Sequence, residues 1–365
     1  MTFDPTLLDA LLGRITPTDP AAETAARTRL DQLTKPPGSL GKLEDVAARV
    51  ACVQGTERPA VARKAILLFA ADHGVVAQGV SAFPQEVTWQ MVANFAAGGA
   101  AINQLAASVG AELRLHDVGV AADTSGFVGV EQIKVARGAA DMSLGPAMTR
   151  EQATEAILAG ARAAGAAIDD GATLLGTGEM GIGNTTAAAA LTAAYCGVDP
   201  AAVVGPGTGL PADALPHKAA VIARALDVND TASLDPLGVL AAVGGLEIAA
   251  LVGVMLGTAA RRTCVVVDGF ISGSAALAAV ALAPGSAGYL LPSHRSAEPG
   301  HSVALAHLGM EPVLDLDMRL GEGTGAALAM GIIDAACRML SGMATFAEAG
   351  VAGADTASPA EEPPA

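Results

Sequence analysis

The sequence predicts an α/β protein in which helices cover both faces of a parallel sheet. From about residue 65, short apolar runs without polar alternation are separated by longer Ala-rich stretches at helical spacing, which is typical of strands that are buried on both faces. Most of the polar and Gly-rich segments follow directly after those runs. Because ligands of open parallel sheets bind at the carboxyl ends of the strands, we expect the functional site at that edge.

The predicted elements begin with helices over residues 1–60, where Ala, Leu and Arg recur at helical spacing. Residues 35–42 interrupt them as a turn, because Pro36 and Pro37 cannot lie inside a helix. The small, acidic and Pro-rich residues 348–365 are predicted to be disordered. Between these ends we predict strands at residues 65–71, 113–118, 173–175, 203–204, 264–267, 288–291 and 313–316.

The composition excludes several classes of protein. Apolar residues make up 52% of the chain and charged residues 16%, which excludes disorder along its whole length. The formal net charge of −16 is unfavourable for binding nucleic acid, so an anion site has to be built locally from backbone amides and a few cations. Four scattered cysteines without a CxxC motif exclude a disulfide-built module and a zinc ribbon. The N-terminus has no signal-peptide pattern, and we expect a cytoplasmic protein.

One apolar run, residues 237–260, is long enough to span a bilayer. Glu247 near its centre would be costly in lipid, and the run is rich in Gly and Ala rather than Leu. These features favour a helix buried in a protein core, and a membrane span remains the alternative.

The Gly-rich segment 176–186 carries the sharpest local signal. It leaves a predicted strand and enters a helix, where converging backbone N–H groups favour an anion such as phosphate. Ordinary helix capping by its Asn and Thr residues is the alternative. Gly176, Gly178 and Gly181 form a formal GxGxxG, but no acidic residue ends the next predicted strand, which disfavours a dinucleotide.

Carboxylates follow other predicted strands. Glu322 lies between two glycines just before a helix, where it could act as a general base or interact with the helix dipole. Asp315 and Asp317 alternate at a strand end, and Asp72 precedes His73 at another. These groups suggest hydrogen bonding between loops more than a divalent-metal site.

The segment 81–91 holds the only Trp of a chain with 3% aromatic residues. Phe83, Trp89 and Met91 would form a flat apolar wall beside a strand end, which suggests a slot for a flat ligand. A small hydrophobic plug is the alternative.

Taken together, several long motifs resemble the nicotinate-nucleotide–dimethylbenzimidazole phosphoribosyltransferase family over about residues 35–335. The motifs are KPPGSLGKLE (35–44), ADHGV (71–75), FPQEVT (83–88), GEMGIGNTT (178–186), DGFISGSAAL (268–277), SHRSAEPGH (293–301) and DMRLGEGTGA (317–326). The alternatives to this family are a nucleotide-binding regulatory module without chemistry and a membrane protein built around 237–260.

The resemblance implies transfer of 5-phosphoribosyl from nicotinate mononucleotide to 5,6-dimethylbenzimidazole, without a metal or organic cofactor. The products are α-ribazole 5′-phosphate, for the lower ligand of cobalamin, and nicotinate. It implies a homodimer of subunits with a Rossmann-like, mostly parallel sheet flanked by helices. This sheet domain would cover residues 61–325, and a small helical domain would combine residues 1–60 and 326–347.

The resemblance also assigns site residues. Glu322 would be the general base, and Glu179 and Lys218 a catalytic charge pair near the nicotinate or ribose. The phosphate and the rest of the nucleotide would be held by Gly181, Ile182, Gly183, Asn184, Thr185, Thr186, Gly207 and Ser296. The aromatic base would lie against Phe83, Gln90, Met91 and Leu320.

Overall fold

A computed structural model describes residues 6–352 of the chain and divides it into two compact units. The sheet unit contains the residues up to Pro17 together with Ala62–Gly331. The helical unit contains Thr18–Val61 and the residues from Ile332 onward. The expected boundary at residue 60 therefore does not hold for the first helix, α1 (Thr6–Leu12), because Leu8 and Leu11 are buried in the core of the sheet unit.

The sheet of this unit has six parallel strands in the order β3-β2-β1-β4-β5-β6. The chain runs outward from β1 through β2 to β3 and then returns to the other side of β1 to form β4. This reversal creates a switch point between β1 and β4, the place where ligands of such sheets bind. The strands are β1 (Lys64–Ala71), β2 (Ala111–Gly119), β3 (Val130–Gln132), β4 (Leu174–Met180), β5 (Cys264–Val267) and β6 (Leu290–Pro292).

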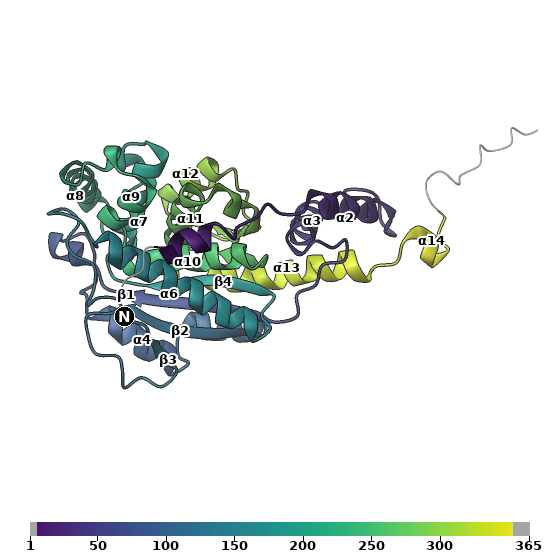
Figure 1. Cartoon of the computed structure of the whole chain (residues 1–365), viewed down its shortest axis with the longest axis horizontal. Coiled ribbons are helices and arrows are strands. Elements are labelled where there is room, and N and C mark those ends of the chain that lie inside the picture. Colours follow the sequence, from purple (N-terminus) through teal and green to yellow (C-terminus); the bar gives the residue numbers. More distant parts are fainter. Residues whose placement is uncertain (1–5, 353–365) are drawn as a thin grey trace, which may run out of the picture. The chain divides into compact units, whose positions relative to one another are not determined.

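Helices cover both faces of the sheet (Figure 1). One face carries α6 and α10, which contact each other more extensively than any other pair of elements. Gly160 of α6 would bring a Cβ within 1.9 Å of Ala250 O, so the two helices meet backbone to backbone. This close approach gives the abundance of small residues a structural meaning. The helices of this face are α6 (Arg150–Asp169), α10 (Leu246–Ala260) and α11 (Phe270–Leu282). The other face carries α4 (Val87–Ala96) and α5 (Ala101–Ser108).

The apolar run 237–260 forms two buried helices rather than one. They are α9 (Pro236–Val243) and α10, and the chain bends between them at Gly244 and Gly245. Among the described residues, one other helix, α13 (Thr324–Gly342), reaches the length and apolar character of a membrane span, with half of that stretch buried. The remaining longer helices of the sheet unit are α7 (Asn184–Cys196), α8 (Leu215–Val228) and α12 (Pro299–Leu308).

Two strand predictions need correction. Val203 and Val204 are buried but follow a short 3₁₀ helix, Pro200–Ala202, because core burial makes a turn as apolar as a strand. The last predicted strand is a short β8 (Leu314–Asp315), which pairs with β7 (His294–Arg295) in a separate two-stranded sheet. The edge strand β3 escaped prediction because two of its three residues are polar and exposed.

The helical unit contains α2 (Pro20–Gln32), α3 (Lys42–Gln54), the C-terminal part of α13 and α14 (Phe346–Ala349). Its core consists of small and Leu residues such as Leu30, Ala47 and Leu340. The predicted turn between α2 and α3 is closed by a buried Lys35–Glu44 ion pair at 2.8 Å. Helix α14 includes the first two residues of the segment predicted to be disordered, so that prediction is wrong there, and residues 353–365 lie outside the described part of the chain.

Candidate active site

A cavity of about 320 Å³ opens in the sheet unit at the carboxyl ends of β4 and β5. Most of the residues predicted from sequence line it, although they come from distant parts of the chain. Lys218, Gly183, Thr186 and Gln90 are not on the lining. The predicted residues on it are Phe83, Met91, Glu179, Gly181, Ile182, Asn184, Thr185, Gly207, Ser296, Leu320 and Glu322.

The Gly-rich loop offers fewer free amides than its sequence suggests. The N–H of Ile182 donates to Thr88 Oγ1 at 3.1 Å. The N–H groups of Asn184 and Thr186 donate to carbonyls within the loop. Within the described part of the chain, the N–H groups of Gly183 and Thr185 have no acceptor, and of these two residues Thr185 lies on the cavity at the start of α7.

Lys218 places a cation beside the same loop from α8. Its Nζ donates to Thr185 Oγ1 at 2.8 Å and to the Gly205 carbonyl at 3.2 Å. Burial lowers the pKa of Lys218 to about 8. The expected charge pair with Glu179 is wrong, because among the described residues Lys218 forms no ion pair with it and instead orients Thr185.

Glu179 is buried at the end of β4 and accepts a hydrogen bond from Asn184 Nδ2. Burial, and next the charges of Glu247 and Asp268, raise the pKa of Glu179 to about 8. The group is therefore mostly a neutral carboxylic acid at pH 7, which reduces repulsion with the other acids around the cavity.

Glu322 lies on a turn in which three consecutive residues adopt positive φ: Gly321 at 85°, Glu322 at 63° and Gly323 at 87°. A Cβ on Gly321 would lie 2.3 Å from Glu179 Oε1. The turn is held by Asp268 from the end of β5, whose carboxylate accepts the N–H groups of Gly323 at 3.1 Å and Ala326 at 2.9 Å. A non-Gly residue in the left-handed region needs such support.

The carboxyl of Glu322 is only half satisfied. The N–H of Ile102 at the start of α5 lowers the pKa of this carboxyl, whereas Oε2 is buried and has no partner among the described residues. Burial, with the charge of Asp268, raises the pKa of Glu322. A buried carboxyl oxygen without a donor is unfavourable until a proton or a ligand N–H reaches it.

Another buried acid, Glu247, lies next to the Gly-rich loop. Glu247 of α10 is fully buried and its Oε1 lies 2.6 Å from His73 Nε2. Burial alone would lower the pKa of His73, but Glu247 and Asp72 raise it. Gly181 of the loop has no room for a side chain here, because a Cβ on it would lie 2.5 Å from Ala71 O and 3.2 Å from Glu247 Oε1.

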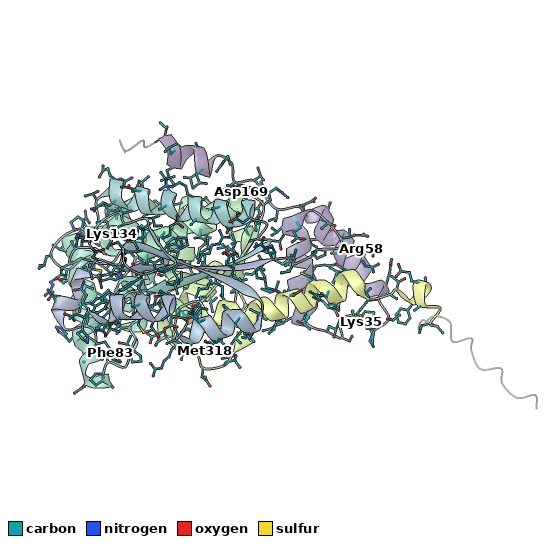
Figure 2. The ribbon with its side chains drawn as sticks, turned by 90° about the horizontal axis from the view of Figure 1, so that it is seen from below. Lys35, Arg58, Phe83, Lys134, Asp169 and Met318 are labelled. Atoms are coloured by element: carbon teal, nitrogen blue, oxygen red, sulfur yellow. The ribbon has the colours of Figure 1, made fainter. Side chains whose placement is uncertain are left out.

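The apolar wall of the cavity differs in part from the expected one. Phe83 is 47% exposed and lies at the outer edge of its unit (Figure 2), and it lines the cavity with Met91 and Leu320. Trp89 and Gln90 are absent from the lining, because they occupy other faces of the helix that carries Met91. Thr88 is fully buried and ties this helix to Ile182 and Asp72.

Sequence reasoning missed several polar residues of the lining, namely Asp268, His294, Glu298 and Arg319. Asp268 lies in the motif DGFISGSAAL and Glu298 in SHRSAEPGH. Both motifs follow predicted strands, and this position could have indicated the two residues. Ser296 is oriented within the second motif, where its N–H donates to His301 Nδ1 at 2.9 Å. Burial lowers the pKa of His301 to about 3, which leaves it a neutral acceptor. Among residues 6–352, no cluster of three or more His, Cys, Asp or Glu is suited to a metal ion.

A parallel sheet with a switch point, a Gly-rich loop beside a buried Lys and an acid on a strained turn define an α/β enzyme whose site lies at the strand ends. A family model described as phosphoribosyltransferase matches residues 15–351. The chain belongs to this phosphoribosyltransferase family.

Individual relatives agree along nearly the whole chain. A nicotinate-nucleotide–dimethylbenzimidazole phosphoribosyltransferase of Chloroflexus aggregans is 55% identical over 345 residues, covering 94% of this chain and 98% of the relative. One of Geobacter metallireducens is 53% identical, covering 95% and 98%. The crystal structure of the enzyme so named from Thermus thermophilus has a TM-score of 0.87 at 51% identity, covering 92% of this chain and 99% of that one.

Proposed function

We propose that this protein transfers the 5-phosphoribosyl group from nicotinate mononucleotide to 5,6-dimethylbenzimidazole. The products are α-ribazole 5′-phosphate and nicotinate. The observation that carries the proposal is the half-satisfied carboxyl of Glu322, which lies on a cavity that joins an apolar wall to a Gly-rich loop. The names of the relatives support the choice of substrates.

Glu322 is the general base in this proposal. One ring nitrogen of the benzimidazole attacks C1′ of the ribose while the other ring nitrogen loses its proton to Glu322. The bond from C1′ to the pyridinium nitrogen breaks, and its electron pair stays on that nitrogen, so nicotinate departs. The phosphoribosyl group moves from one nitrogen to another, and the proton ends on Glu322. Attack from the face opposite the leaving group inverts C1′ and gives the α-linkage.

The flat base lies between Phe83, Met91 and Leu320, whose apolar surfaces are partly exposed. Their burial by an aromatic ring removes apolar area from water, and the sulfur of Met91 adapts to different ring outlines. This contact turns the ring N–H toward Glu322, whose Oε2 has no partner among the described residues.

The phosphate is held at the start of α7. Its donors are the free N–H of Thr185 and the hydroxyls of Thr185 and Ser296, and Lys218 orients the Thr185 hydroxyl. Because the phosphate is remote from C1′, its binding energy orients the reacting carbon without taking part in bond making. Neutral Glu179 lies between this subsite and Glu322, where it can donate a hydrogen bond to the leaving nicotinate.

The family also suggests the assembly and the location. We propose a homodimer, as the resemblance implies, and a cytoplasmic enzyme. Sedimentation of the purified protein tests the dimer, and fractionation of lysed cells tests the location.

The reaction is tested by measuring nicotinate release from nicotinate mononucleotide with and without 5,6-dimethylbenzimidazole. We expect release only when the base is present. Glu322→Gln keeps the size of the side chain but removes the base, and should lose most turnover while still binding both substrates. Glu57→Gln in the helical unit is the matched control, since Glu57 is exposed and far along the chain from the site. Stabilisation by nucleotide without nicotinate release would instead indicate a binding module and contradict the proposal.

A further inference from the structure

Glu298 is a buried acid on the cavity to which the proposed mechanism gives no role. It is 3% exposed and lines the cavity. It stands at the N-cap position of α12, yet its side chain does not cap that helix. Instead, Oε1 accepts the N–H of Gly207 at 2.8 Å, and Oε2 is buried without a partner among the described residues. Helix capping therefore does not explain this carboxyl.

The turn opposite Glu298 is shaped around it. A Cβ on Gly205 would lie 2.1 Å from Glu298 Oε2, so any larger residue there would displace the carboxyl. Gly207 has a φ of 55°, and a Cβ on it would lie 2.7 Å from Thr185 Oγ1. Gly205 and Gly207, in the segment 205–209, thus leave room for Glu298 on one side and for the phosphate-binding Thr185 on the other.

The surroundings of Glu298 are cationic. Arg319 Nη1 donates to the Gly207 carbonyl at 2.9 Å, on the same residue whose N–H binds Glu298. Burial raises the pKa of Glu298, whereas the charges of Lys218 and Arg319 oppose that rise. Glu298 Oε2 is therefore an acceptor without a donor, next to two cations that stabilise the carboxylate form.

The substrates of the proposed reaction offer few donors. The benzimidazole has a single ring N–H, which Glu322 receives. In nicotinate mononucleotide the phosphate and the carboxylate are acceptors, and the pyridinium nitrogen carries no hydrogen. The two ribose hydroxyls are the only donors left, and they lie between the phosphate and the reacting carbon.

We infer that Glu298 accepts hydrogen bonds from the ribose hydroxyls and is the residue by which the enzyme selects a ribonucleotide. The inference rests on the proposed function, because it takes the nucleotide substrate from it. Glu298 then accepts from the hydroxyls of the sugar, and Glu322 accepts the ring N–H of the base. A site built to bond a hydroxyl rejects the analogue that lacks it, since its own acceptor is left unpaired.

The test compares nicotinate mononucleotide with its 2′-deoxy and 3′-deoxy analogues, for the wild type and for Glu298→Gln. The amide oxygen of the variant can still accept from Gly207 N–H, so the turn is retained. In the wild type we expect kcat/KM to fall roughly 10- to 150-fold for at least one analogue, the range for a hydrogen bond to a charged group. In Glu298→Gln the ratio of kcat/KM for nicotinate mononucleotide to kcat/KM for that analogue should shrink at least about fivefold. The main reason is that turnover of the full substrate falls.

Two controls keep the outcomes separate. Glu57→Gln should show the wild-type ratio. If Glu298→Gln lowers kcat/KM for all three nucleotides equally, or leaves the ratio unchanged, Glu298 does not bind the hydroxyls and the inference is overturned. If the wild type releases no nicotinate with any base, the proposed function fails, and the ratio of calorimetric binding constants for the same three nucleotides still tests Glu298 by itself.

Discussion

Asp268 accepts the N–H of Gly323 at 3.1 Å, which ties the end of β5 to the turn that carries Glu322. Its other oxygen accepts the N–H of Ala326 at the start of α13. The acid proposed as the base thus owes its position to a second acid that lies far earlier in the sequence.

Replacing Asp268 should affect both the position and the acidity of Glu322. Asp268→Asn keeps only one of the two carboxylate oxygens that accept these N–H groups. The turn should therefore become less ordered, and kcat should fall by roughly tenfold or more. The charge of Asp268 also raises the pKa of Glu322 and of Glu179. Its removal should therefore move the acidic limb of the pH–rate profile to lower pH, and an unmoved limb would contradict this coupling.

The activity of the wild type should itself fall on acidification at a higher pH than an ordinary carboxyl would give. A general base must be ionised, and burial raises the pKa of Glu322. The limb is measured as kcat/KM for the base against pH, which reports the pKa of Glu322 before the base binds. An inflection at or below the ordinary Glu value would show that Glu322 is not the group that titrates.

Stability should depend on pH through Glu179, whose pKa is raised to about 8. A raised folded-state pKa means that the folded protein holds the proton more tightly than the unfolded chain. This contribution is fully present below the unfolded-state pKa and is lost as pH rises through about 8. Denaturation midpoints measured across that window should fall more steeply for the wild type than for Glu179→Gln; equal slopes would contradict the assignment.

Lys218→Met should weaken nucleotide binding, because Lys218 orients Thr185 and supplies the cation of the phosphate subsite. We expect KM for nicotinate mononucleotide to rise by roughly 10- to 150-fold, with a smaller change in KM for the base. Nucleotide affinity of the wild type should also decline above about pH 8, where Lys218 loses its charge. Arg338→Met removes an exposed cation of α13 and should leave both constants unchanged.

Gly321→Ala should be disruptive because the new Cβ would meet Glu179 Oε1 at 2.3 Å and the backbone has a φ of 85°. A loss of about 2 kcal/mol or more in unfolding free energy is expected, together with lower activity. Gly126→Ala is the matched control, since a Cβ there has nothing within 4 Å. Equal unfolding free energies for the two variants would show that the turn relaxes without cost.

Several structural features were predictable from local sequence because their causes are local. Buried parallel strands are continuously apolar, so β1, β2 and β5 could be recognised, whereas β3 is short and polar. The same signal misled at Val203 and Val204, since burial alone makes a segment apolar whatever its backbone conformation. Long motifs likewise indicated Glu322 and the 178–186 loop, because backbone geometry there demands glycine.

The sequence by itself determined the α/β class, the strand-end position of the site and half of the residues that line the cavity. Only the tertiary structure decided which of them are free to act. It showed that the amide of Ile182 is taken by Thr88, that Lys218 serves Thr185 rather than Glu179, and that Glu298 is held by Gly207. The physical reason is that hydrogen-bond partners and burial depend on residues brought together from far apart in the chain, and no local pattern records them.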